Sequence, residues 1–116
     1  LTHDFFLGFI KIHILYHAVE RKVYGLWLIE ELSRHGYKIS PGTLYPMLHS
    51  LEKERYLKCQ KELVKGKIRK YYKTTEKGKR VLIEARKKIK ELIKEVIVWI
   101  RKETEDLPLK RHKKDF

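Results

Sequence analysis

The sequence predicts a mostly α-helical fold with one small β-hairpin, in the order helix, helix, helix, hairpin, long helix. Three observations predict it. Apolar residues recur at spacings of three and four along the first half of the chain, the pattern changes to alternation around a glycine, and a long helical pattern then returns. At 116 residues the chain has the size of one domain with one modest core.

The first two helices are defined by their apolar stripes and by one glycine. We expect helix from Phe5 to Val19 and again from Tyr24 to Arg34, with Gly36 suited to a left-handed cap after the second. The stripes consist of Leu7, Ile10, Ile14 and Ala18 in the first helix, and of Leu28, Ile29 and Leu32 in the second.

The third helix begins with residues that favour a helix start. Ser40 can cap it through its side chain, and Pro41 suits the first helical position, where its missing N–H costs nothing. Pro46 removes one helical hydrogen bond, so we expect a bend or a tight first turn there. The apolar stripe that faces inward consists of Leu44, Leu48 and Leu51, with Met47 at its edge. The opposite, non-apolar face carries Gly42, Pro46, His49 and Lys53.

The hairpin and the last helix complete the pattern. Residues 57–64 alternate, residues 68–75 are rich in β-formers, and Gly66 lies between them where a tight turn prefers glycine. Thr75 is a plausible N-cap for a helix that Pro108 must end. Two short helices followed by a hairpin indicate a winged helix-turn-helix. The predicted parts are a DNA-binding domain (1–75), a C-terminal dimerisation helix (76–105) and a basic tail (106–116).

Composition points to a polyanionic partner. The chain has 28 Lys and Arg against 15 Asp and Glu, a net charge of +13, which makes nucleic acid the first candidate and an anionic membrane the second. The single cysteine, Cys59, excludes an internal disulfide. No apolar run suits a membrane span, so we expect a cytoplasmic protein that neither binds nor crosses a membrane. No catalytic constellation is visible, so we expect neither an enzyme nor a cofactor.

Three segments carry a resemblance to a known family. "YGLWLIEEL" (24–32), "GTLYPMLHSLEKERYL" (42–57) and "RKYYKTTEKGK" (69–79) resemble the PadR family of winged-helix transcriptional regulators in order and spacing, and the match covers roughly Leu7 to Val81. The resemblance implies a homodimer that binds an inverted-repeat operator through two recognition helices and two wings. It also implies repression that a small, often aromatic, effector relieves. One departure is Arg55, which stands where the family usually has glycine and would cost about 1 kcal/mol in a left-handed conformation.

The predicted DNA contacts come from the third helix and the hairpin. From Lys65 to Arg80 there are eight Lys or Arg and one acidic residue, a local net charge of +7. A charged hairpin can also be only a solvated face, Thr43 can serve only the helix start, and Tyr45 can pack beside Leu44. The predicted DNA-binding residues are Tyr24, Ser40, Thr43, Tyr45, His49, Lys65, Lys67, Arg69, Lys70 and Lys73.

The long helix carries a heptad-like apolar seam, which favours pairing of two copies. The predicted dimerisation residues are Leu82, Ala85, Ile89, Leu92, Val96 and Trp99. Trp99 has two interpretations, plain interface packing or one wall of a pocket for a flat aromatic effector.

Histidines offer one further pattern. His13 and His17 lie four apart with Glu20 one turn further, a spacing that allows a surface metal site, but without a second cluster of ligands we expect no metal.

The leading hypothesis is a sequence-specific, dimeric transcriptional regulator that acts as a repressor, with double-stranded DNA as its partner. Two other classes stay open: a non-specific DNA-packaging or RNA-binding protein that uses the same basic surface, and a protein-interaction adaptor that works through the apolar long helix. Competition with random duplex distinguishes the first two.

Overall fold

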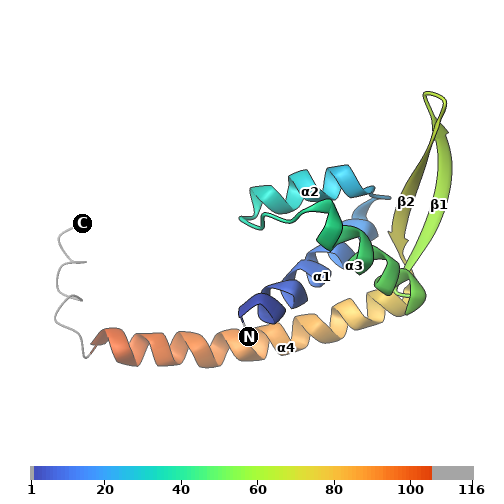
Figure 1. The fold of residues 1–116 in the computed structure, drawn as a ribbon. Helices are drawn as coiled ribbons and strands as arrows, with labels where there is room; N and C mark the ends of the chain where they lie inside the picture. Colours follow the sequence, from blue (N-terminus) through green and yellow to red (C-terminus); the bar gives the residue numbers. More distant parts are fainter. Residues whose placement is uncertain (1, 106–116) are drawn as a thin grey trace. The chain divides into compact units, whose positions relative to one another are not determined.

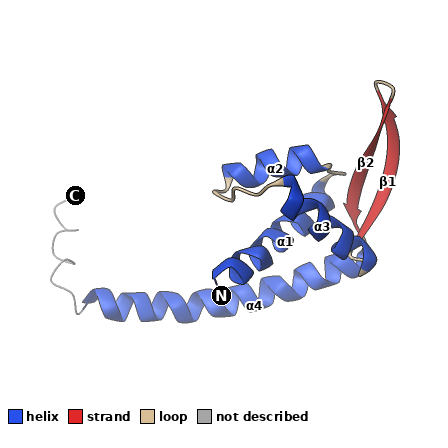
Figure 2. Cartoon of the chain, viewed as in Figure 1, coloured by secondary structure: helices blue, strands red, loops and turns tan. Residues whose placement is uncertain are grey.

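The computed structural model describes residues 2–105 and has the predicted order of elements (Figures 1 and 2). The mostly α-helical fold class with one hairpin is confirmed. The elements are α1 (Thr2–Glu20), α2 (Gly25–Arg34), α3 (Pro41–Lys53), β1 (Leu57–Val64), β2 (Lys67–Thr74) and α4 (Glu76–Glu105).

One hydrophobic core joins the first three helices to the base of the hairpin. This compact unit runs to Ile83 and so includes the first two turns of α4, whereas the rest of α4 belongs to a second unit. The buried side chains with no or almost no exposed surface are Ile14, Ala18, Val23, Leu28, Leu32, Leu44, Leu48 and Leu57. The apolar stripes expected for the three helices therefore do form one core.

The end of α2 confirms the role predicted for Gly36. Its φ is +88°, and it follows the C-cap residue His35. The Gly36 N–H donates to the Ser33 carbonyl, and the Tyr37 N–H donates to the Leu32 carbonyl at 2.9 Å. This pair of bonds is a Schellman motif, which satisfies the last carbonyls of the helix and fixes the position of His35.

At the start of α3 the predicted side-chain cap is wrong, and the predicted position of Pro41 is confirmed. Ser40 is the N-cap residue by its extended backbone (φ −85°, ψ 159°), but its side chain makes no capping bond; its hydroxyl lies 3.4 Å from that of Thr43 instead. The Ser40 carbonyl accepts the N–H groups of Thr43 and Leu44. Pro41 is the first helical residue, as predicted, and α3 continues as one helix across Pro46.

The end of α3 repeats the Schellman arrangement without glycine. Arg55 adopts φ +66°, the Arg55 N–H donates to the Glu52 carbonyl, and the Tyr56 N–H donates to the Leu51 carbonyl. The left-handed Arg55 considered from the sequence is therefore present. Its charged side chain is exposed, so the strain of a left-handed residue is local to the backbone.

Thr75 connects the end of α3 to the beginning of α4. Its hydroxyl donates to the Arg55 carbonyl at 2.6 Å and accepts the Gly78 N–H at 3.0 Å, which is the N-cap bond predicted for this residue. Gly78 is buried, and a Cβ there would lie 2.7 Å from Thr74 Cγ2 and closer still to the Tyr56 carbonyl oxygen. The backbone can cross at this point because residue 78 has no side chain.

The hairpin of Leu57–Thr74, called the wing below, is paired over its full length. The antiparallel register runs from Leu57 opposite Thr74 to Val64 opposite Lys67. The two turn residues, Lys65 and Gly66, have φ values of +51° and +78°, the left-handed pair that a type I′ turn requires.

Three hydrogen bonds attach the base of the wing to the helices. Val23 forms a two-bond antiparallel bridge with Tyr72, with N···O distances of 2.9 and 2.7 Å. The buried Thr74 hydroxyl donates to the Leu15 carbonyl of α1 at 2.7 Å. The direction of the wing is thus fixed by α1 and by the segment between α1 and α2.

The described part of α4 covers thirty residues, beginning one residue after Thr75 as expected. Pro108 and the predicted basic tail (106–116) lie outside the described residues. Of the helices within residues 2–105, none combines the length and the hydropathy that a membrane span requires.

Candidate nucleic-acid interface

One face of α3 is turned to solvent and the other to the core. Leu44, Leu48 and Leu51 are buried. The outer face predicted from the sequence is exposed. The exposed positions of α3 are Pro41, Gly42, Tyr45, Pro46, His49, Ser50 and Lys53.

Tyr45 extends from this face toward the start of α2. Its ring lies against Gly25, at a place that a side chain at residue 25 would otherwise occupy: a Cβ there would be 2.6 Å from Tyr45 Cζ. The Tyr45 side chain is still 44% exposed. It therefore does not pack into the core beside Leu44, the alternative considered from the sequence, but lies between two helices with its edge in solvent.

A groove joins this part of the helices to the wing. It is lined by residues of the α2 start, of α3 and of both wing strands: Tyr24, Gly25, Leu26, Tyr45, Lys61, Val64, Lys65, Lys67, Ile68, Arg69, Lys70 and Tyr72. Five of these are cationic and none is acidic. Such a lining suits a phosphate backbone that passes between the wing and the exposed face of α3.

Aromatic rings hold Arg69 at the wall of this groove. The guanidinium carbon of Arg69 lies 4.2 Å from the centroid of the Tyr24 ring, and the Tyr24 and Tyr71 rings meet edge to face at 5.5 Å. The neighbouring Tyr71 side chain raises the pKa of Arg69 above its ordinary value. Arg69 is thus a permanent, oriented cation.

The other wing cations are left without acidic partners. Glu62 is the sole acidic residue of the wing, and it pairs with Lys22, which also lies 4.7 Å from the centroid of the Tyr71 ring. Within residues 2–105, no Lys or Arg of the wing forms an ion pair of its own. The wing therefore presents uncompensated positive charge to solvent.

Comparison with known proteins identifies the family. The model of the transcriptional regulator PadR-like family matches residues 14–84 of this chain, which include α2, α3 and the whole wing. The chain belongs to the PadR-like family. Its members are transcriptional regulators and not enzymes, and the match assigns the helices and the hairpin to a DNA-binding winged helix.

Relatives agree with this assignment. The transcriptional regulator Rv3488 of Mycobacterium tuberculosis is 47% identical over 88 residues, which cover 76% of this chain and 82% of the relative. A PadR family regulator from Eggerthella lenta has a TM-score of 0.75 at 31% identity, covering 85% of this chain and 88% of its own. A PadR-like regulator from Bacillus cereus has a TM-score of 0.76 at 29% identity, with 84% and 96% covered.

The PadR fold does not bring all the predicted DNA-binding residues to one place. Tyr24 and Tyr45 share the groove with four predicted wing residues, Lys65, Lys67, Arg69 and Lys70. Ser40 and Thr43 border a different hollow, beside Tyr37 and the end of α2. His49 is exposed further along α3, and Lys73 lies at the base of the wing in a hollow that also includes Lys22.

Sequence reasoning did not give the structural roles of several residues that shape this PadR groove. Gly25 makes room for the Tyr45 ring, Tyr71 orients Arg69, and Lys22 neutralises Glu62. Lys61 lines the groove from β1. The alternation of the strand placed Lys61 on the same wing face as Lys70, its partner in the register, which is the signal that could have found it.

The seam of α4 is exposed over most of its length. Leu92, Val96 and Trp99 are 52%, 41% and 60% exposed. Ala85 and Ile89 are half-buried, whereas Leu82 packs against the core of its own chain.

Proposed function

We propose that this PadR-like protein represses transcription as a homodimer bound to an inverted-repeat operator. The single observation that carries the proposal is the groove that combines Tyr45 of α3 with the unpaired cations of the wing. The exposed face of α3 enters the major groove, and the wing holds the flanking phosphates through Lys65, Lys67, Arg69 and Lys70.

The helix start limits how bases are read. Within the first two turns of α3 there is no Arg, Asn or Gln, the side chains that make the strongest bidentate contacts with bases. His49 and Thr43 reach toward base edges, and Tyr45 and Ser40 toward phosphate. Specificity then depends strongly on the shape and deformability of the operator, which the rigidly attached wing detects.

Dimerisation supplies the second half-site. The exposed side chains of α4 form an apolar face that a single chain leaves in water, and a second copy of the same helix covers it with the same residues. Two PadR heads joined in this way bind half-sites about 34–36 Å apart, one turn of the duplex. The seam comprises Leu82, Ala85, Ile89, Leu92, Val96 and Trp99.

An aromatic effector would release the operator by binding at Trp99 in this dimer interface. Trp99 is 60% exposed, and an aromatic face of this kind stacks with flat ligands. The chain has only two tryptophans, Trp27 and Trp99. In a Trp27→Phe protein, quenching of the remaining fluorescence by an aromatic compound, together with loss of operator binding, is the expected result.

The experiment that tests the proposed function is selection of random duplexes by the purified protein at about 150 mM salt, followed by sequencing. A specific regulator enriches one inverted repeat and holds it against excess random duplex by a factor of roughly a thousand or more. An unenriched pool would favour the packaging protein.

Two wing variants separate DNA binding from the adaptor hypothesis. Arg69→Ala and Lys67→Ala should each weaken operator binding clearly, and Lys67→Ala should reduce the slope of log affinity against log salt by about 1. Lys94→Ala, an exposed lysine of α4, is the matched control with the same change of charge. Equal affinities in all three variants would show that the wing does not bind the duplex.

A further inference from the structure

Three histidines gather where α1 meets the end of α2. His13 and His17 come from α1, and His35 is the residue that caps α2. One ring nitrogen of each lies within 4.8 Å of the others. The sequence offered His13 and His17 with Glu20; the fold instead brings His35 to them as a third histidine.

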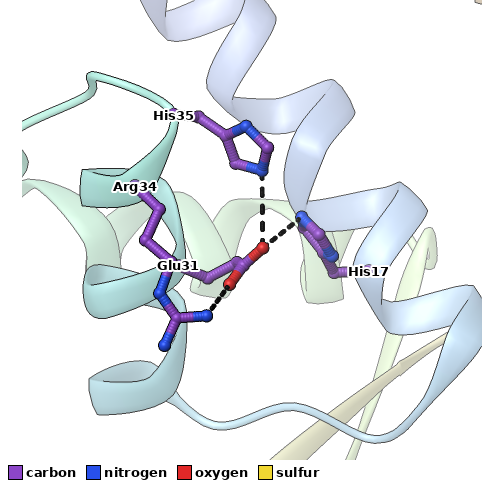
Figure 3. Close-up of polar contacts among 4 residues, drawn as sticks. All are labelled: His17, Glu31, Arg34 and His35. Carbon is purple, nitrogen blue, oxygen red and sulfur yellow. Dashed lines mark hydrogen bonds and ion pairs between the residues drawn. The ribbon is translucent and has the colours of Figure 1, made fainter.

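A carboxylate completes this cluster. Glu31 Oε2 lies 3.4 Å from His35 Nε2 and 3.8 Å from His17 Nε2, while its other oxygen accepts a hydrogen bond from Arg34 at 3.0 Å. Figure 3 shows the rings of His17 and His35 directed at the same carboxylate oxygen and Arg34 at the other. Arg34 therefore orients Glu31 and leaves Oε2 facing the histidines.

Local structure explains why these side chains meet. His13 and His17 are four apart, as are Glu31 and His35, so each pair lies on one helix face. The Schellman motif at Gly36 ends α2 and holds His35 on that face. Ring contacts further restrict the orientation of His13. Its ring stacks on His35 at 4.8 Å and meets Tyr37 edge to face at 5.3 Å.

His17 Nε2 is the unexplained atom of the cluster. It is buried and has no hydrogen-bond partner among the described residues, and Glu31 is too distant to provide one. Buried polar atoms are rarely left in this state.

We propose that His13, His17 and His35, with Glu31 as fourth ligand, bind a divalent transition-metal ion such as Zn²⁺. Three imidazoles and one carboxylate form a donor set that zinc accepts in tetrahedral geometry. Ligand nitrogens around zinc are about 3.3 Å apart, as follows from Zn–N bonds of about 2.0–2.1 Å. The His35 side chain is 43% exposed, so its ring can turn to bring the ligand nitrogens closer together.

The ion would join α1 to the end of α2 and so stabilise the folded head, because these ligands are brought together only by folding. This inference is independent of operator binding. Arg34, by holding the far oxygen of Glu31, has the supporting role that partners of metal ligands commonly have.

The test is titration of untagged, chelator-treated protein with Co²⁺, followed by visible absorption, and with Zn²⁺, followed by calorimetry and thermal unfolding. The expected result is one ion per chain, with the intense absorption of tetrahedral Co²⁺ and a higher melting temperature in Zn²⁺. His35→Ala and His13→Ala should each weaken binding by at least about tenfold. His49→Ala, which removes an exposed histidine of α3, should bind as the wild type does.

Two results would overturn the proposal. Absence of binding by the wild type would mean that the rings form only an aromatic cluster with Tyr37. Undiminished binding by a folded His13→Ala, His35→Ala double variant would place the ion elsewhere. Circular dichroism of each variant establishes that it is folded, and because His35 is exposed, its replacement removes a ligand without opening the core.

Discussion

The ring of Tyr45 occupies the space that a side chain at Gly25 would need. A Cβ at residue 25 would lie 2.6 Å from Tyr45 Cζ. We therefore expect Gly25→Ala to displace the Tyr45 ring into solvent. If Tyr45 contacts a phosphate, operator affinity falls roughly tenfold, equivalent to one charge-assisted hydrogen bond of about 1.5 kcal/mol. Titration of a labelled operator with wild-type and Gly25→Ala protein measures this change in affinity.

The control for that substitution is Gly8→Ala. A Cβ at Gly8 has no neighbour within 4 Å, so the same chemical change meets open space in α1. It should leave operator binding unchanged. Wild-type affinity in Gly25→Ala would show that the position of Tyr45 does not matter for binding.

Gly78→Ala should destabilise the fold by about 1–3 kcal/mol, the usual cost of overpacking. The added methyl group meets the Tyr56 carbonyl, a backbone group held by the Thr75 N–H at 3.0 Å, and it cannot simply rotate away. Gly8→Ala should instead stabilise by about 0.5–1 kcal/mol, because alanine favours a helix. Urea unfolding at one protein concentration measures the free energy of unfolding of both variants. A change of the same sign in Gly78→Ala and Gly8→Ala would contradict the prediction.

Arg55→Gly should stabilise the protein by about 1 kcal/mol. Arg55 adopts φ +66°, where glycine lacks the steric penalty of an L side chain, although the gain is reduced by the greater entropy of glycine in the unfolded chain. Thermal unfolding measures the difference. A lower melting temperature would mean that the Arg55 side chain contributes more than its backbone strain costs.

We expect the free energy of unfolding to depend on pH in the alkaline range because of Tyr72. Burial raises the pKa of Tyr72 to about 12, and Cys59, its cross-strand partner, adds to the shift. Below pH 10 both folded and unfolded Tyr72 are neutral; above it only the unfolded form ionises. Stability is therefore lost between about pH 10 and pH 12, by up to about 2–3 kcal/mol. The difference in unfolding free energy between wild type and Tyr72→Phe should change by this amount over that range, and a constant difference would contradict it.

Local patterns were sufficient for the elements of this fold. The stripe of Leu44, Leu48 and Leu51 predicted the buried face of α3 because helical period and burial coincide there. Gly36 and Gly66 marked chain reversals because few other residues tolerate their φ values. The cap at Thr75 was equally local. The wrong prediction concerned Ser40, whose hydroxyl lies near Thr43 instead of capping the helix.

Contacts between distant segments were beyond those patterns. The meeting of Gly25 with Tyr45 depends on how α2 packs on α3, and the position of Arg69 depends on rings from two different elements. The histidine cluster is the clearest case. His35 follows His17 by eighteen positions in the printed sequence, and only the packing of α1 against α2 makes them neighbours.

The lysines of the wing have a consequence for the protein when no duplex is bound. Among the described residues nothing pairs with the outer edge of β1, and Leu63 and Ile68 near the turn are 74% and 69% exposed. An open strand edge with apolar tips invites the hairpins of other molecules to add to it and aggregate. Lys58 and Lys61 lie on this strand and Lys65 lies in the turn that follows it, and their positive charges repel a second copy. Replacement of these lysines by uncharged residues should therefore lower the solubility of the protein as well as its affinity for DNA.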